Sequence, residues 1–183
     1  MPRVRKRPIP QDLPPLKDRI EPSVRVLFVG INPGVRSALT GHHFAGFSNR
    51  FWKLLFESGL VPEKVSYVDD DRLPQWGLGI TNLIPRPTPG VGDLAPGEYA
   101  AGRAGLLRKI RRYQPRIVVL IGVSLARALL PLARGEALGL GISPHALAGV
   151  PVFVLPNPSG RNAHFSYAQM LEAFTSLREY LAR

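Results

Sequence analysis

The segment that decides the fold spans residues 24–34 and reads VRVLFVGINPG. Its first six residues are apolar except for one arginine and are rich in valine, which is typical of a β-strand buried on both faces. The glycine that follows ends the strand, and the Asn-Pro-Gly sequence forms a turn. Strands buried on both faces occur in parallel sheets that helices cover on both sides, so this segment predicts an α/β fold.

Three further segments have the same strand character, and four others have the apolar spacing of helices. The predicted strands are residues 24–29, 79–84, 117–121 and 152–155. The predicted helices are residues 49–58, 99–113, 124–133 and 167–182. This alternation predicts a mostly parallel sheet of about four strands with helices on both sides. Ligands in such folds bind outside the carboxyl ends of the strands, so the chemistry is expected in the loops that follow them.

The chain has the length of one domain with a basic segment in front of it. A domain typically has about 100–200 residues, and a chain of 183 residues, 45% of them hydrophobic, can bury one core. Residues 1–22 carry six prolines and six Lys or Arg residues without periodicity, which predicts a flexible, extended arm. We therefore expect a basic, proline-rich arm over 1–22 and a single domain over 23–183. The arm either adds phosphate contacts or is a solvated leader.

The charge of the chain indicates a polyanionic partner. The sequence holds 24 Lys and Arg residues against 13 Asp and Glu residues, a net charge of +11, and nineteen of the cations are arginines. Arginine binds phosphate oxygens through two N–H groups at once, which suits a nucleic-acid surface. The alternative is that the charge serves solubility alone.

Several classes of site and location are disfavoured by what the sequence lacks. It has no cysteine, and its four histidines do not have the spacing of zinc ligands, so we expect no bound metal. No apolar run approaches the roughly 18–20 residues that a membrane span needs. The N-terminus also lacks the apolar stretch of a secretory signal. We therefore expect a cytoplasmic protein with no membrane contact, associated with the nucleoid if the cell is bacterial.

Four motifs follow one another along the chain in an order that identifies a family. They are GINPG at 30–34, NRFWK at 49–53, ITNL at 80–83 with RPT at 86–88, and NPSG at 157–160. From about residue 24 to the C-terminal helix the chain resembles the mismatch-specific uracil-DNA and thymine-DNA glycosylases of the uracil-DNA glycosylase superfamily. The resemblance implies that superfamily's three-layer α/β/α sandwich. It also implies an enzyme that flips a base out of duplex DNA and hydrolyses its N-glycosidic bond.

The resemblance assigns roles to residues of the base pocket. Asn32 would position the attacking water, and as a neutral amide it can orient water but cannot take up its proton. The other pocket residues implied by the family are Ile31, Gly34, Ser37, Phe44, Asn82 and Asn157. Backbone N–H groups around Ile31 and Phe44 would bind the base carbonyls.

Some of these pocket residues have alternatives or depart from other members of the superfamily. The ring of Phe44 would stack on the base, or else it packs in the core. Ser37 would lie at the pocket wall that meets the thymine methyl group. Asn82 falls where some relatives carry lysine. Asn157 stands where the most active relatives carry a histidine that stabilises the leaving base, so turnover should be slow.

The loop after the last predicted strand matches the loop that inserts into the DNA base stack in this family. The residues implied as DNA-binding are Ser159, Gly160, Arg161 and Asn162. Some relatives place an aliphatic wedge where this chain has Arg161. Its guanidinium either fills the gap left by the flipped base or contacts a phosphate.

Two further expectations concern a catalytic carboxylate and the absence of strand cleavage. Asp93 lies in a Gly/Pro loop after the second predicted strand and is a candidate base or electrostatic stabiliser, with a helix-cap or turn role as the alternative. The acidic run at 69–71 is expected to face solvent. The five lysines avoid the strand-end loops, and because a bifunctional enzyme needs an amine nucleophile, we expect base excision without strand cleavage.

Together these observations predict a monomeric DNA repair glycosylase without a cofactor. It would act on double-stranded DNA with mismatched or damaged bases and remove uracil, preferentially from G·U mismatches, leaving an abasic site. Thymine and other damaged pyrimidines are further candidate bases. The alternatives are a non-catalytic α/β module that binds nucleic acid and a hydrolase of free nucleosides or nucleotides.

Overall fold

The computed structural model describes residues 13–183, and the arm expected over 1–22 lies partly outside this range. A five-stranded sheet forms the centre of the domain, with the strand order β2-β1-β3-β5-β4. Its strands are β1 (Val26–Gly30), β2 (Leu78–Asn82), β3 (Ile117–Ile121), β4 (Gly141–Leu147) and β5 (Val150–Leu155). All neighbouring strands pair in parallel except β4, which pairs antiparallel with β5. The predicted mostly parallel α/β sheet is therefore confirmed.

The expected number of about four strands is corrected to five by β4. This edge strand alternates between half-buried and exposed residues instead of forming a continuous apolar run. Its pairing with β5 shifts register between Ile142 and Ala146, around Pro144. Proline and irregular pairing are tolerated at a sheet edge, and they remove the sequence signal on which the prediction of strands depends.

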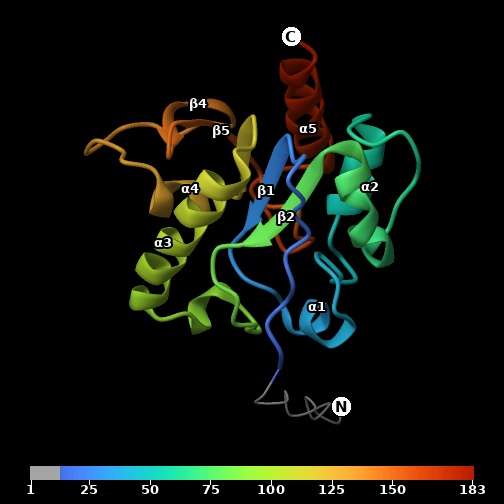
Figure 1. Cartoon of the computed structure of the whole chain (residues 1–183), viewed down its shortest axis with the longest axis horizontal. Helices are drawn as coiled ribbons and strands as arrows, with labels where there is room; N and C mark the ends of the chain where they lie inside the picture. The colour runs from blue at the N-terminus through green and yellow to red at the C-terminus, as the bar shows by residue number, and fades with distance from the viewer. Residues whose placement is uncertain (1–12) are drawn as a thin grey trace.

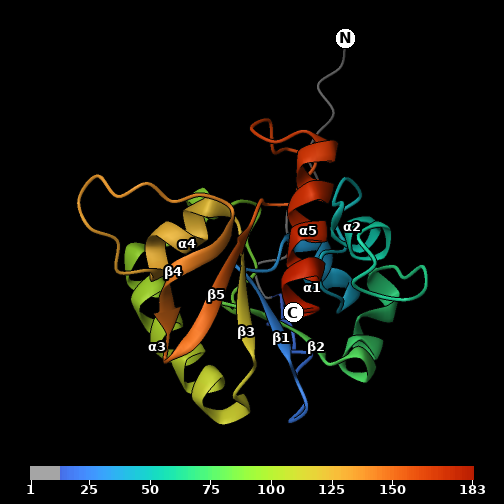
Figure 2. The same ribbon diagram turned by 90° about the horizontal axis from the view of Figure 1, so that it is seen from above.

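Helices cover both faces of the sheet and make the three layers seen in Figure 2. The α-helices are α1 (Val35–Thr40), α2 (Phe51–Glu57), α3 (Pro96–Tyr113), α4 (Val123–Leu129) and α5 (Tyr167–Leu181), and the 3₁₀ segments are η1 (Tyr67–Trp76) and η2 (Val91–Asp93). Because side chains alternate across a strand, Phe28 and Val119 join a core with α2 and α5, while Val29 and Val118 join a second core with α3 and α4. The sequence predicts neither α1 nor the two 3₁₀ segments. No helix within the described range is long and apolar enough to cross a membrane.

The described part of the predicted arm is attached to the domain. Residue Arg19 forms an antiparallel bridge with Ile80, with both backbone N–H···O distances at 2.9 Å. Asp18 lies 2.6 Å from the ammonium group of Lys109 and also accepts the hydroxyl of Thr81. This segment runs beside β2 (Figure 1). Residues 18 and 19 are therefore in contact with the domain expected over 23–183.

One carboxylate of the acidic run 69–71 is buried, which corrects the expectation that the run faces solvent. The side chain of Asp70 is fully buried. It lies 3.0 Å from the guanidinium of Arg19 and 2.9 Å from Nδ1 of His42, and it accepts the backbone N–H of His43 at 2.8 Å. Because a buried carboxylate needs partners, Asp70 ties the N-terminal segment and the loop after α1 to η1.

Candidate active site

One cavity lies at the carboxyl ends of the central strands and has a volume of about 180 Å³. This is below the roughly 300–1,000 Å³ of pockets for drug-sized ligands, and it suits a single planar ring. Its lining includes all seven residues expected to hold the water and the base, namely Ile31, Asn32, Gly34, Ser37, Phe44, Asn82 and Asn157. The two Asn-Pro loops, which follow β1 and β5, therefore meet around one cavity.

The amide of Asn32 is held in one orientation by acceptors around its nitrogen. Nδ2 donates to Oγ1 of Thr88 at 2.7 Å, to the carbonyl of Arg86 at 3.1 Å and to that of Pro33 at 3.3 Å. Thr88 is buried and donates its own proton to the carbonyl of Gly90 at 2.7 Å, so its oxygen is left as an acceptor for Asn32. This arrangement leaves Oδ1 of Asn32 with no donor within residues 13–183, and that oxygen can accept a hydrogen bond from water.

The loop that carries Thr88 is anchored by an ion pair. Arg86 donates to both carboxylate oxygens of Glu98, at 2.8 and 2.7 Å, which lowers the pKa of Glu98 to about 2. A parallel bridge between Gly34 and Thr88 joins this loop to the turn after β1. Thr88 belongs to the quoted RPT motif, but no local pattern in the sequence indicates its bond to Asn32.

Phe44 lies between the core and the cavity. Its ring stacks on the core residue Phe51 with centroids 4.2 Å apart, and it also lines the cavity. The backbone of Phe44 has a φ of 52°, which is uncommon for a bulky residue. Within residues 13–183, the backbone N–H groups of Phe44 and Ile31 have no protein acceptor. Both can therefore donate to a ligand in the cavity.

Asn157 presents the opposite end of its amide to the cavity. Its Oδ1 accepts the backbone N–H of Ser159 at 3.0 Å, which forms an Asx turn. The carbonyl of Asn157 accepts Nδ2 of Asn162 at 2.9 Å. The Nδ2 group of Asn157 has no acceptor in the described part of the chain, so the cavity combines an amide acceptor from Asn32 with an amide donor from Asn157.

His43 also lines the cavity, although no sequence motif predicts a role for it there. It is buried, and its Nε2 lies 2.9 Å from the carbonyl of Lys17. Since a carbonyl can only accept, Nε2 carries the proton. Burial lowers the pKa of His43, although hydrogen bonding to Lys17 and the charge of Asp70 oppose this effect. The neutral ring leaves Nδ1 as an acceptor, 3.5 Å from Nδ2 of Asn82.

The remaining wall contacts explain why two small residues stand in the cavity. Gly30 leaves room for Asn82, because a Cβ at Gly30 would lie 2.8 Å from Oδ1 of Asn82. Ser37 is buried and its hydroxyl accepts the backbone N–H of Ala45 at 3.1 Å. The side chain of Leu16, from the predicted arm, also lines the cavity. That contact joins parts of the chain far apart in sequence, so no local pattern signals it.

The loop expected to enter DNA lies directly beside the loop before α2. Ser48 touches Gly160 so closely that a Cβ at Gly160 would lie 2.5 Å from that of Ser48. The backbone N–H of Arg50 also donates to the carbonyl of Pro158 at 2.9 Å. Arg161 is exposed, as a residue that contacts DNA must be.

Two predicted site residues are used inside their own loops. The carboxylate of Asp93 accepts the backbone N–H of Gly90 at 3.0 Å and does not line the cavity. That is the turn role that the sequence left as an alternative to catalysis. Asn162 holds the carbonyl of Asn157, and its own oxygen accepts the N–H of His164 at 3.0 Å. Its side chain shapes the loop.

The cavity has the chemistry of neutral polar groups. Among residues 13–183, no Asp, Glu, Lys or Arg residue lines it. Within residues 13–183, no group of three or more His, Cys, Asp or Glu side chains is placed to hold a metal ion. Amides, a hydroxyl, a neutral imidazole and backbone N–H groups surround the space, which suits an uncharged ring with both donors and acceptors.

Comparison with known proteins places the chain in a family. The family model of the uracil DNA glycosylase superfamily matches residues 18–182. The chain belongs to this superfamily. Among solved structures it is similar to a solution NMR structure from Methanosarcina acetivorans described as a "putative Uracil DNA glycosylase". The two are 18% identical, with a TM-score of 0.65 and coverage of 91% of this chain and 97% of that one. At this identity the likeness supports the fold, and the predicted α/β sandwich is confirmed.

Proposed function

We propose that this superfamily member hydrolyses the N-glycosidic bond of uracil in double-stranded DNA and leaves an abasic site. The observation that carries the proposal is the meeting of Asn32, Phe44 and Asn157 around one cavity of about 180 Å³. A water acceptor, an aromatic ring and an amide donor there fit the requirements of excising one base.

In the proposed mechanism Asn32 orients the attacking water through Oδ1. Three acceptors hold its Nδ2 group, so the amide keeps its oxygen toward the cavity. A neutral amide cannot accept the proton of water, and the rate enhancement therefore comes from positioning and from stabilising the departing base.

The base would be bound by donors and by stacking. The backbone N–H groups of Ile31 and Phe44 would donate to its carbonyl oxygens, and the ring of Phe44 would stack on it. The Nδ2 group of Asn157 would donate to the leaving base as negative charge develops. An amide stabilises this charge less than a protonated side chain does, so we expect slow turnover.

The proposed preference for G·U mismatches depends on the exposed loop 158–162. Arg161 would fill the space left by the flipped base and contact the opposite guanine, while Gly160 keeps the loop against Ser48. A mispaired base costs less to extrude than a paired one, which favours mismatches. Ser37, at the cavity wall, would meet the methyl group of thymine and set the discrimination between the two pyrimidines.

We further propose that the enzyme is monofunctional. Among residues 13–183, no lysine lines the cavity. A Schiff base with the sugar requires an amine at the reaction centre. Borohydride should therefore trap no covalent adduct with DNA.

Single-turnover assays on labelled duplexes test the proposal. Duplexes with U·G, U·A, T·G or C·G at one position are incubated with excess enzyme, and abasic sites are then cleaved by alkali. We expect the fastest cleavage for U·G, slower cleavage for U·A and T·G, and none for C·G. Asn32→Ala should reduce the rate about a hundredfold or more, by analogy with losing one positioned polar group. Binding without product from the wild-type protein would instead support the non-catalytic alternative.

A further inference from the structure

Phe47 is the most exposed large apolar side chain in the described chain. Its exposed fraction is 90%, compared with 61% for Leu39, the next in order. It stands between Gly46 and Asn49, which both line the base cavity. An exposed aromatic ring beside a cavity is available to stack on a partner.

The ring is held by an arginine from α1. The guanidinium carbon of Arg36 lies 3.6 Å from the centroid of the Phe47 ring. Arg36 is itself fixed, since its Nε donates to the carbonyl of Ala45 at 2.6 Å and its other end lies 3.4 Å from the hydroxyl of Tyr67. One face of the ring is therefore supported by a cation, and the opposite face can stack on a ligand.

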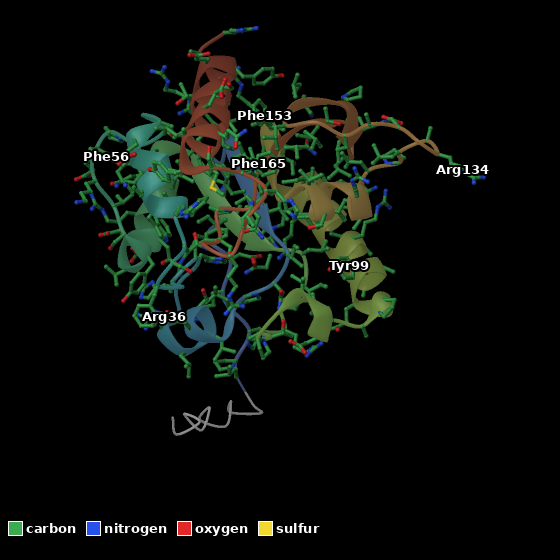
Figure 3. All side chains as sticks on the ribbon, turned by 180° about the vertical axis from the view of Figure 1, so that it is seen from behind. Arg36, Phe56, Tyr99, Arg134, Phe153 and Phe165 are labelled. Carbon is green, nitrogen blue, oxygen red and sulfur yellow. The ribbon has the colours of Figure 1, made fainter. Side chains whose placement is uncertain are left out.

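A groove of about 470 Å³ lies beside this ring and shares part of its wall with the base cavity. Phe44, Gly46 and Asn49 line both spaces. Figure 3 shows Arg36 and Phe56, which line the groove, on the same side of the molecule. The groove is aromatic and cationic, which is the composition of surfaces that bind nucleic-acid strands. Besides Phe47 and Arg36, it is lined by Trp52, Lys53, Lys64 and Tyr67.

Glu57, the acidic residue among those that line the groove, already has hydrogen-bond and ion-pair partners. Glu57 accepts the hydroxyl of Tyr167 at 2.6 Å and lies 3.6 Å from the ammonium group of Lys53. The arginine and two lysines of the lining therefore leave an excess of positive charge, complementary to a phosphate backbone.

We propose that Phe47, supported by Arg36, is a second DNA-contacting side chain that stacks on a nucleobase next to the flipped nucleotide. The strand would continue past Phe47 into the groove. Ser48, its neighbour, touches Gly160, so the ring and Arg161 stand on adjoining loops. Phe47 thus supplies the apolar contact that Arg161 does not. This inference rests on the proposed action on DNA.

The test measures binding to a duplex that carries a tetrahydrofuran abasic analogue opposite guanine. Phe47→Ala should bind about tenfold more weakly by fluorescence anisotropy, the size of effect that loss of one base–aromatic stack has. Phe47→Trp should bind within about threefold of wild type, and its additional indole emission should be quenched by the DNA, because the indole would stack on a base. Ile142→Ala is the matched control, since Ile142 is 49% exposed on the distant edge strand β4.

The outcomes separate this inference from the proposed function. Because Phe47 is exposed, Phe47→Ala should keep the wild-type melting temperature, and the binding comparison then reports contact alone. Equal binding by wild type and Phe47→Ala, or unquenched emission from Phe47→Trp, overturns the inference even if uracil is released. A change in sedimentation without a change in DNA binding would assign Phe47 to a protein interface and also overturn it. If Phe47→Ala binds DNA more weakly than wild type but the wild-type protein releases no uracil, the DNA contact is supported and the glycosylase proposal is rejected.

Discussion

Replacing Thr88 by valine tests whether the orientation of Asn32 limits the reaction. The substitution keeps the shape of the buried side chain and removes its hydroxyl. Two hydrogen bonds of 2.7 Å are lost, one from Nδ2 of Asn32 and one to the carbonyl of Gly90. Asn32 retains only the longer contacts to the carbonyls of Arg86 and Pro33, at 3.1 and 3.3 Å.

The expected loss follows from these contacts. A neutral hydrogen bond contributes about 0.5–1.5 kcal/mol, which corresponds to about two- to thirteenfold in rate. A misplacement of about 1 Å at a reacting group can cost about a hundredfold. We therefore expect Thr88→Val to slow uracil release about ten- to a hundredfold. The lost bonds should also lower the free energy of unfolding by about 1–3 kcal/mol.

The assay is single-turnover release of uracil from a U·G duplex with enzyme in excess, so that product release does not mask the chemical step. Thr88→Ser is the matched control because it keeps the hydroxyl, and it should retain most of the wild-type rate. Urea unfolding of both variants shows whether they are folded under assay conditions. A Thr88→Val enzyme that is folded and works within about twofold of wild type would refute the positioning role.

Three further predictions concern the loops and the buried histidine. Gly160→Ala should weaken binding to abasic DNA and lower the melting temperature, because its Cβ would lie 2.5 Å from that of Ser48; wild-type values for both would show that the loops can separate freely. His43 has a lowered pKa in the folded state, so the unfolded chain binds the extra proton first and stability should fall as the pH drops below 6.5. Urea midpoints between pH 8 and 5 should therefore change less in His43→Gln than in wild type, and equal slopes would contradict this. Asp93→Asn should keep the single-turnover rate within about threefold, because the amide oxygen can still accept the N–H of Gly90; a loss of a hundredfold would restore Asp93 as a catalytic group.

The sequence predicts the central strands because strands buried on both faces appear as continuous apolar runs. Each of β1, β3 and β5 lies between two helical layers, so nearly every residue is apolar and the run is visible. The edge strand β4 is half exposed and contains proline, so it has no continuous apolar run by which to recognise it. Helix α1 has six residues, and a segment this short offers too few turns for a helical period to be recognised.

The site divides in the same way between local and distant contacts. The meeting of Asn32 and Asn157 is predictable, since both follow parallel strands and the carboxyl ends of such strands share one edge. The contacts of His43 with Lys17 and of Asp70 with Arg19 join segments 26 and 51 residues apart. No local pattern encodes these pairings, so the sequence predicts a solvated surface for the acidic run around Asp70.

The neutral lining of the cavity accounts for the importance of its geometry. The net charge of the chain is +11, yet no charged side chain from the described part of the chain lines the cavity. In the proposed reaction, positive charge on the outer surface attracts the DNA backbone, while the base meets uncharged groups: the Phe44 ring, the His43 imidazole, amides, a hydroxyl and backbone N–H groups. Amides, hydroxyls and backbone N–H groups accept no proton from water, so they accelerate hydrolysis only if their dipoles already point at the places where charge develops. Since that orientation is fixed by the contacts behind the cavity wall, we expect buried residues such as Thr88 to control the rate without touching the substrate.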